Sequence, residues 1–284
     1  MAFRPSELSR ITKKETINTL RIINDGVHPG SFNMAADEAL LVELMKNPVS
    51  PTLRFYQWEK PTLSLGYFQK INEVNIERIE AKGYDIVRRP TGGRAVLHWE
   101  EVTFCLVIPA FKRGLWEIFK SIHEALESGL NMIGISARVL PVEKYGRGIR
   151  NRTSACFASP SRYELMLNGK KIAGTAQKKV GDYMLAHGSI PIRPKFKYLF
   201  EILNFQNDEE REIAYKNAVA KMTSLYGETG LDYLFEDICN ALISGFEKSW
   251  GCNVYEDNFT SSEIKLIANL EEEKYNNPGW LFRY

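Results

Sequence analysis

Cys156 stands in a segment whose neighbours favour reactivity over packing. It lies in SACFASPS (154–161), with Arg152 before the segment and Arg162 directly after it. The thiolate is the nucleophilic form of cysteine, and a nearby cation lowers the pKa of a thiol from its ordinary value of about 8.5. Lys171, fifteen residues further on in NGKKIAGTAQ, is a candidate for that cation and for a proton carrier. The alternative is that Cys156 is a small buried hydrophobe.

A second group of candidates surrounds two adjacent glycines in RRPTGGRAVLH (88–98). Paired glycines between strands are typical of an ordinary hairpin turn. The polar residues around them favour a binding loop, because a backbone without Cβ atoms approaches a ligand closely. Such a loop suits a carboxyl, a phosphate or an acyl carbonyl, and its spacing excludes a P-loop. The candidate binding residues here are Arg88, Arg89, Thr91, Gly92, Gly93, Arg94 and His98.

A third candidate is His187, in LAHGSI. It belongs either to the same site as Cys156 and Lys171 or to the structural histidines that hydrogen bonds hold in a strand. The chain has four histidines, and its four cysteines show no CxxC spacing, so we expect no metal site. Free thiols fit a reducing cytoplasm.

The net charge of +2 hides two oppositely charged regions. Between residues 138 and 179, ten Lys and Arg against two Glu give a local charge of +8. From residue 201 to the end, sixteen Asp and Glu against seven Lys and Arg give −9. Both regions are consistent with solvated faces. The alternative is that the basic region steers an acidic partner towards Cys156. A nucleic acid fits less well, because stacking aromatics are not interleaved with these charges.

Periodicity and turn signals predict strands first and helices later. The predicted strands are 52–58 and 62–68, which we expect to pair with each other, then 84–90, 104–111 and 182–192. A hairpin is predicted at 162–177, because Asn168-Gly169 supplies the positive φ angles of a type I′ turn. Helices are predicted at 33–46, 113–132, 231–250 and 261–275, and we expect the chain after 195 to be mainly helical.

These elements predict an α+β fold with a mixed or largely antiparallel sheet flanked by helices, because helical crossovers are too few for a doubly wound sheet. A length of 284 residues favours one core, with a catalytic domain at 1–255 and a C-terminal helical extension at 256–284 packed on it. No apolar run approaches the roughly eighteen residues of a membrane span. No secretory signal follows the N-terminal charges. We therefore expect a cytoplasmic protein that does not contact membranes.

Five motifs of the chain, taken together, resemble a known family. They are NMAADEALL, LRFYQWEKPTLSLGYFQ, RRPTGGRAVLH, SACFASPSRYELMLNGKKIAGTAQ and LAHGSIPI. Their types and order are similar to those of the lipoate–protein ligase and octanoyltransferase superfamily, which also contains biotin ligases. The resemblance covers about residues 20 to 280. It implies the catalytic-domain fold of the biotin and lipoate protein ligases.

Within that superfamily, the cysteine separates two chemistries. Lipoate–protein ligases activate a free acid with ATP and have no cysteine at this place. The octanoyl-[acyl carrier protein]:protein N-octanoyltransferases of the Gram-positive type have ACF before PS and YE, and then the KIAG lysine, as this chain does. The resemblance implies that Cys156 forms an acyl-thioester intermediate and that Lys171 lowers the pKa of its thiol. It adds Ala155, Gly174, His187 and Gly188 to the expected substrate-binding residues.

The implied reaction moves octanoyl from octanoyl-acyl carrier protein to a lysine of a lipoyl domain, with the glycine cleavage H protein as the expected acceptor. We expect no ATP and no other cofactor, and a monomeric enzyme. Two departures from the ligase pattern favour transfer. Arg94 and Trp99 stand where many ligases have a glycine and an aspartate, and the chain ends with KYNNPGWLFRY, which leaves no room for an accessory C-terminal domain.

Three alternatives stay open at this point. The first is an ATP-dependent lipoate–protein ligase. The second is an octanoyl amidotransferase that works between lipoyl domains by the same cysteine chemistry, and TGGRAVLH argues weakly against it. The third is a catalytically silent relative that binds lipoylated domains.

Overall fold

The fold is built on a six-stranded mixed sheet, seen in a computed structural model that describes residues 17–47, 51–110, 113–141 and 163–284. In spatial order its strands are β10 (Gly174–Val180), β11 (Tyr183–Pro191), β6 (Glu101–Pro109), β2 (Thr52–Trp58), β1 (Thr19–His28) and β12 (Asn253–Glu256). The three pairings among the first four strands are antiparallel, whereas β1 is parallel to both β2 and β12. The predicted mixed sheet is confirmed.

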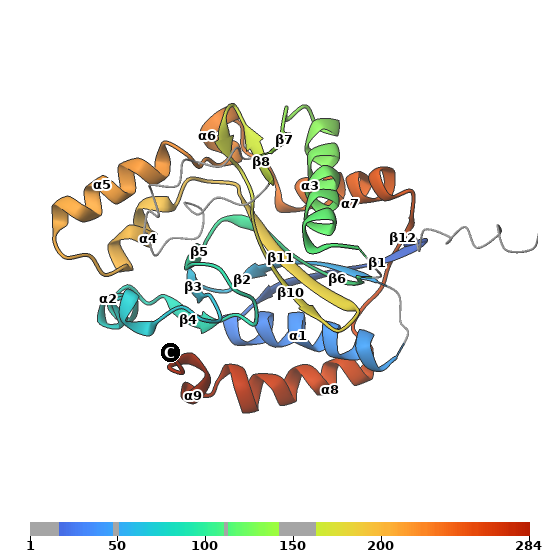
Figure 1. Ribbon diagram of the computed structural model, residues 1–284, viewed down its shortest axis with the longest axis horizontal. Helices are drawn as coiled ribbons and strands as arrows, with labels where there is room; N and C mark the ends of the chain where they lie inside the picture. The colour runs from blue at the N-terminus through green and yellow to red at the C-terminus, as the bar shows by residue number, and fades with distance from the viewer. Residues whose placement is uncertain (1–16, 48–50, 111–112, 142–162) are drawn as a thin grey trace, which may run out of the picture.

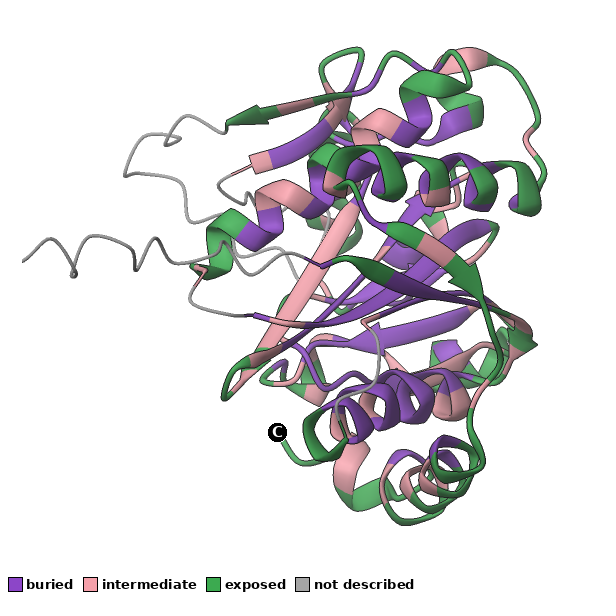
Figure 2. Cartoon of the chain, turned by 90° about the vertical axis from the view of Figure 1, so that its right-hand side faces the viewer, coloured by how far each residue is buried: buried purple, intermediate pink, exposed green. Residues whose placement is uncertain are grey.

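Helices cover both faces of this sheet (Figure 1). On one face lie α1 (Gly30–Lys46) and α8 (Ser261–Leu270), and on the other α3 (Leu115–Met132) and α7 (Phe235–Trp250). Strand β6 shows why both are needed. Phe104 and Leu106 pack in the core with α3 and α7, whereas Cys105 and Val107 pack in the core with α1. Alternate side chains of a strand point to opposite faces, so a continuously apolar strand requires cover on both sides (Figure 2).

Two smaller sheets flank the main one. The first contains β4 (Asp85–Arg88), β3 (Thr62–Leu65) and β5 (Val96–His98), and the second contains β7 (Arg138–Pro141), β8 (Tyr163–Leu167) and β9 (Lys170–Lys171). The predicted pairing of 52–58 with 62–68 is wrong, because β2 pairs with β1 and β6 while β3 pairs with β4 and β5. Alternation identifies a strand but not its partner, and both edges of β2 are taken by other strands.

The hairpin predicted from Asn168-Gly169 is confirmed at its turn. The two residues have φ angles of 48° and 78°, and β8 pairs with β9 across them. Strand β9 is only two residues long, and its Lys171 also bonds residues 221 and 223 on the other side. The chain then enters β10 of the main sheet, so the predicted hairpin divides between two sheets.

The C-terminal part of the chain is mostly helical, as expected, with one exception. Strand β12 joins the main sheet beside β1, and the sequence reading contained neither of these strands. Helix α8 then packs on α1, and Arg21 of β1 forms a buried ion pair with Glu263 of α8. The remaining α-helices are α2 (Ile76–Ala81), α4 (Phe196–Ile202), α5 (Asp208–Val219), α6 (Leu225–Thr229) and α9 (Pro278–Leu281). A 3₁₀ turn, η1 (Ile71–Glu73), precedes α2, and a π-helical segment, η3 (Glu271–Tyr275), continues α8. Within the described ranges, no helix combines the length and apolarity needed to cross a membrane.

Helices α3 and α7 cross in close contact at Gly129 and Gly245, which have no side chains to separate them. A Cβ atom on Gly245 would lie 2.3 Å from the Ala125 carbonyl oxygen and 2.5 Å from the Gly129 nitrogen. Gly245→Ala should therefore lower the free energy of unfolding by about 1–3 kcal/mol, because the helices must separate. Urea denaturation followed by circular dichroism measures this. Ser244→Ala, at the exposed neighbouring position, is the matched control, and equal stability of the two variants would contradict the crossing.

Candidate active site

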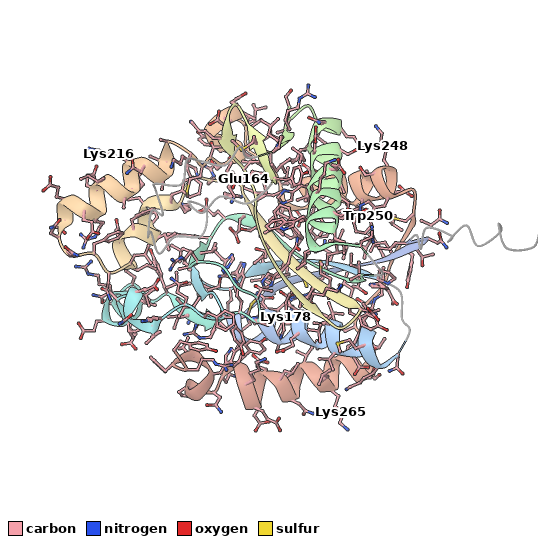
Figure 3. The ribbon with its side chains drawn as sticks, viewed as in Figure 1. Glu164, Lys178, Lys216, Lys248, Trp250 and Lys265 are labelled. Carbon is pink, nitrogen blue, oxygen red and sulfur yellow. The ribbon has the colours of Figure 1, made fainter. Side chains whose placement is uncertain are left out.

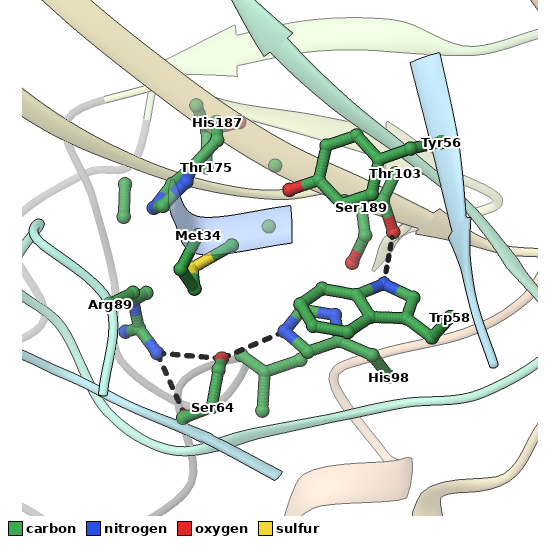
Figure 4. A pocket seen from close by; sticks show the side chains of 14 residues that line it. Met34, Tyr56, Trp58, Ser64, Arg89, His98, Thr103, Thr175, His187 and Ser189 are labelled. Carbon is green, nitrogen blue, oxygen red and sulfur yellow. Dashed lines mark hydrogen bonds between the residues drawn. The ribbon is translucent and has the colours of Figure 1, made fainter. Parts of the chain in front are cut away.

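A pocket lies between the β10–β11 hairpin of the main sheet and the β4-β3-β5 sheet (Figure 4). It encloses about 390 Å³, part of which is open to solvent. Its lining residues are Met34, Tyr56, Trp58, Ser64, Arg89, Val96, His98, Thr103, Gly174, Thr175, Ala176, His187, Gly188 and Ser189. Five residues predicted from the sequence are therefore brought together here: Arg89, His98, Gly174, His187 and Gly188.

His187 is held by partners on both sides of its ring. Its Nδ1 lies 2.9 Å from a carboxylate oxygen of Asp37, and its Nε2 lies 2.5 Å from the Thr91 hydroxyl. A carboxylate only accepts, so Nδ1 carries the proton and Nε2 accepts from Thr91. Burial lowers the pKa of His187, although Asp37 opposes this effect, so the ring is neutral. His187 thus anchors the start of the TGG loop.

Asp37 is itself held by a buried cation. The Arg54 side chain is fully buried, and its guanidinium donates to Asp37 at 2.9 Å, to the Asn33 side chain at 2.7 Å and to Asp25. Burial opposes the charge, but the nearby Asp37 and Asp25 carboxylates outweigh it and raise the pKa of Arg54. Tyr56 also donates to Asp37, at 3.0 Å. The cluster connects β1, β2, α1 and β11.

The glycine loop is held mainly by contacts to its backbone. Arg89 donates to the carbonyl oxygens of Gly92 and Arg94 at 2.9 and 2.7 Å. Gly93 has a φ of 97° and passes so close to Gly66 that a Cβ atom on Gly66 would lie 2.0 Å from the Gly93 oxygen. The missing Cβ atom of Gly66 therefore serves packing against the loop, whereas a Cβ atom on Gly92 would meet nothing within 4 Å. The approach of a ligand to Gly92 and Gly93 stays a prediction.

Arg88 and Arg94 are not brought to the pocket. Arg88 is fully buried and donates to backbone oxygens of the segment from Gly66 to Gln69 and of Leu281, so it fastens the C-terminal helix to the loop after β3. Arg94 is partly exposed and pairs with Glu73 at 3.1 Å. The predicted binding role of Arg88 is corrected to a structural contact, because all three of its guanidinium nitrogens donate to backbone oxygens. Arg94 uses Nη1 for the pair with Glu73, and its binding role stays a prediction.

The opposite end of the pocket is a hydrogen-bonded wall. The His98 ring stacks on Trp58 with 4.1 Å between centroids, and its Nδ1 lies 2.5 Å from Glu101. Thr103 donates to the same Glu101 oxygen at 2.8 Å and accepts from the Trp58 indole at 2.9 Å. His98 Nε2 lies 2.7 Å from the Ser64 hydroxyl. The ring is fixed in position and in tautomer.

Lys171 is buried, with only 7% of its surface exposed, whereas a lysine beside a type I′ turn is usually solvated. Its ammonium lies 3.1 Å from the carboxylate of Glu164. Glu164, labelled in Figure 3, belongs to β8. His123 of α3 lies close enough to feel this charge, which adds to burial in lowering the pKa of His123 to about 3. His123 Nε2 lies 3.0 Å from the hydroxyl of Thr175, a pocket residue. Lys171 is therefore a buried cation whose charge reaches His123, the hydrogen-bond partner of Thr175 in the pocket.

Cys156 and Ala155 lie outside the described residues, so the predicted contact between Cys156 and Lys171 stays a prediction. The other three cysteines, Cys105, Cys239 and Cys252, are buried and free. Burial raises the pKa of each of these thiols. They are therefore protonated at neutral pH and are poor nucleophiles.

Several residues of the site were missed in the sequence, among them Asp37, Arg54, Ser64, Glu101 and His123. The sequence pattern could have identified Asp37, because it interrupts the apolar face that Met34, Leu40, Leu41 and Leu44 form on α1. A charged residue on a buried helix face requires a partner. Nothing in the sequence pattern identifies that partner as Arg54.

The sheet, the pocket and the glycine loop define a catalytic domain of the lipoate-ligase type. The model of the lipoyl protein ligase A/B catalytic domain matches residues 29–247, so the chain belongs to this family. Octanoyltransferase LipM of Carboxydothermus hydrogenoformans is 37% identical, over 94% of this chain and 100% of its own length. Octanoyltransferase LipM of Geobacillus kaustophilus is 34% identical, over 93% and 98%.

Solved structures agree on the fold. A bi-partite lipoate protein ligase of Thermoplasma acidophilum has a TM-score of 0.77 at 23% identity and covers 94% of this chain and 96% of its own. A lipoate-protein ligase A bound with ATP has a TM-score of 0.74 at 25% identity and covers 92% and 98%. The fold and the superfamily predicted from the five motifs are confirmed.

The neutral state of buried His123 generates a prediction on stability. Its pKa of about 3 in the fold lies below the ordinary 6.5, so the unfolded chain takes up a proton that the folded chain does not. This lowers stability as the pH falls from about 6.5 towards 3, by about 1.4 kcal/mol per pH unit. His123→Gln should flatten the loss of unfolding free energy between pH 6 and 4 in urea titrations. Parallel curves for the variant and the natural chain would contradict the assignment.

Proposed function

We propose that this protein is an octanoyltransferase of lipoate biosynthesis that works in the cytoplasm through a thioester on Cys156. Octanoyl passes from the acyl carrier protein to Cys156, and then to a lysine of a lipoyl domain, with the glycine cleavage H protein as the acceptor. The similarity to the LipM octanoyltransferases over nearly the whole chain supports the reaction class. The thioester on Cys156 and the identity of the acceptor protein go beyond that similarity and are part of the proposal.

The buried Lys171 ammonium is the observation that carries the proposal. A cation is costly to bury. Lys171 lies within electrostatic range of His123, whose ring bonds the pocket residue Thr175, in a family that transfers or ligates acyl groups. A thiolate beside it would be stabilised, and the three described cysteines are excluded by their raised pKa values. Cys156 is the remaining thiol of the chain.

Glu164 is an addition to the mechanism expected from the sequence. It holds the Lys171 ammonium at 3.1 Å and neutralises part of its charge. An ammonium has three N–H donors, and the contact with Glu164 orients the group. An ammonium oriented in this way suits a thiolate in the resting enzyme and the oxyanion of a tetrahedral intermediate during transfer.

The energetics require no ATP. Exchange of one thioester for another is nearly balanced in free energy, and amide formation at the acceptor lysine makes the second step favourable. Burial of the seven saturated carbons of octanoyl contributes roughly 5 kcal/mol, at about 0.8 kcal/mol per CH₂. Apolar walls from Met34, Val96 and Ala176 line the pocket that would receive the chain.

The basic region at residues 138–179 steers acidic partners in this proposal, although part of its charge is neutralised within the fold. Lys170, Lys171 and Lys178 lie 3.0, 3.1 and 3.8 Å from Glu228, Glu164 and Glu38, so the fold neutralises part of their charge. Five of the ten basic residues counted between 138 and 179 lie outside the described residues. The steering proposal therefore depends mainly on residues 144–162.

The reaction class is tested by intact-protein mass spectrometry. Mixing the enzyme with octanoyl-acyl carrier protein should add one octanoyl group, and Cys156→Ser should abolish the adduct. An unmodified natural enzyme would favour a silent binder of lipoylated domains. Transfer to a lipoyl domain from free octanoate, ATP and magnesium, without carrier protein, would instead favour a ligase. An acyl-enzyme formed from an octanoylated lipoyl domain but not from carrier protein would favour an amidotransferase.

The role of Lys171 is tested by the pH profile of alkylation at Cys156. Lys171→Ala should move the profile to higher pH by about one unit or more, because the thiolate loses its cation. Lys170→Ala, the adjacent half-buried lysine that pairs with Glu228, is the matched control and should leave the profile in place. Because Lys171→Ala leaves Glu164 without this partner, the double variant Lys171→Met with Glu164→Gln separates the charge effect from misfolding. An unmoved profile in both Lys171 variants would contradict the role.

A further inference from the structure

The side chains of Glu101, His98 and Ser64 form a continuous hydrogen-bonded chain that ends in the pocket wall. Figure 4 shows its bond between Ser64 and His98. The protons along it have one consistent arrangement. The Glu101 carboxylate only accepts, so His98 donates through Nδ1 and its Nε2 accepts the Ser64 hydroxyl proton. Arg89 donates to the same Ser64 oxygen at 3.1 Å. A hydroxyl oxygen has two lone pairs, so one is left for a donor that enters the pocket.

The proposed transfer requires a proton acceptor for the acceptor lysine, and no residue has yet been assigned to that step. The hydrogen-bonded chain of Glu101, His98 and Ser64 would perform it. A lysine amine has an ordinary pKa of about 10.4, so the acceptor side chain arrives as an ammonium. It has no lone pair for attack until it loses a proton. Lys171 is a poor recipient, because in the proposed mechanism it is the cation that stabilises the thiolate.

We propose that Ser64 and His98, positioned by Glu101, relay a proton away from the acceptor lysine in the second half-reaction, an inference that rests on the proposed function. The ammonium donates to Ser64 Oγ, Ser64 passes its own proton to His98 Nε2, and Glu101 faces the imidazolium that forms. The amine then bonds the thioester carbon, the C–S bond breaks, and its electron pair leaves with the Cys156 sulfur. That thiolate takes the second amine proton, and His98 releases the first to solvent.

The other two histidines near the pocket are less suited to this role. His187 bonds Asp37, whose charge Arg54 already shares, and its hydroxyl partner Thr91 is not a lining residue. His123 is charged only near pH 3 and faces Lys171. By contrast, in the part of the chain that the structure describes, Glu101 has no ion-pair partner other than His98.

Charged groups on the neighbouring elements lie around the proposed relay of Ser64, His98 and Glu101. Arg89 bonds Ser64 from the loop after β4, and His187 on β11 lies within electrostatic range of His98. Arg193 and Lys195 line an adjacent pocket together with Glu101, and both pair with Glu100. The Arg89 guanidinium beside Ser64 favours loss of a proton from an incoming ammonium.

The test separates the two half-reactions. The enzyme is first loaded from octanoyl-acyl carrier protein and freed of donor. Loss of the octanoyl adduct is then timed by mass spectrometry, either with glycine cleavage H protein or with hydroxylamine, a nucleophile that is uncharged at neutral pH. Ser64→Ala and His98→Gln should load normally and react with hydroxylamine within about twofold of the natural enzyme. Transfer to the protein lysine should fall about a hundredfold or more.

The pH profile distinguishes a proton relay from a structural role. The deficit of both variants should shrink as the pH rises, because the acceptor lysine then deprotonates without help. Glu101→Gln should show the same pattern, since the carboxylate stabilises the imidazolium. Unchanged transfer to the protein acceptor, or an equal loss with both nucleophiles at all pH values, would overturn the relay. A natural enzyme that forms no octanoyl adduct would overturn the proposed function as well.

Discussion

The pocket depends on one buried cation, the Arg54 guanidinium. A charge without water requires close partners of opposite charge, and removing a partner from such a pair is strongly destabilising. Arg54 finds those partners on separate elements, with Asp25 on β1 and Asp37 on α1. Asp25 reaches it from a register shift of β1 between Asn24 and Val27, where Gly26 adopts a φ of 80°. The irregularity of β1 thus directs the Asp25 carboxylate towards Arg54.

From this cation, a chain of contacts leads to the glycine loop. Asp37 holds His187, and His187 holds Thr91. Arg89 holds the following turn through its carbonyl oxygens. The loop is therefore shaped before any substrate arrives, and preorganisation of this kind lowers the entropic cost of positioning an acyl group. Arg88 and Arg89 of RRPTGGR contribute to that shape as donors to backbone, a role that their charge alone does not suggest.

Where the sequence carried a periodic signal, the fold followed it. The helices at 33–46 and 113–132 and the apolar strand of β6 were predicted closely, since burial of one helix face or of both strand faces leaves a pattern in the chain. The turn at Asn168-Gly169 was predicted because few residues adopt positive φ angles. Strand β1 was missed, and the partner of β2 was wrong, because hydrogen bonds between strands come from backbone groups that every residue shares.

The sequence by itself determined the superfamily, the mixed α+β fold and the list of polar residues from which a site is built, because these depend on residue types and local spacing. Only the tertiary structure decided which of those residues meet. It placed Arg88 against the C-terminal helix, buried Lys171 beside Glu164, and joined Glu101, His98 and Ser64 across three strands. Such contacts arise between segments far apart in the chain, and the geometry of the folded backbone sets them.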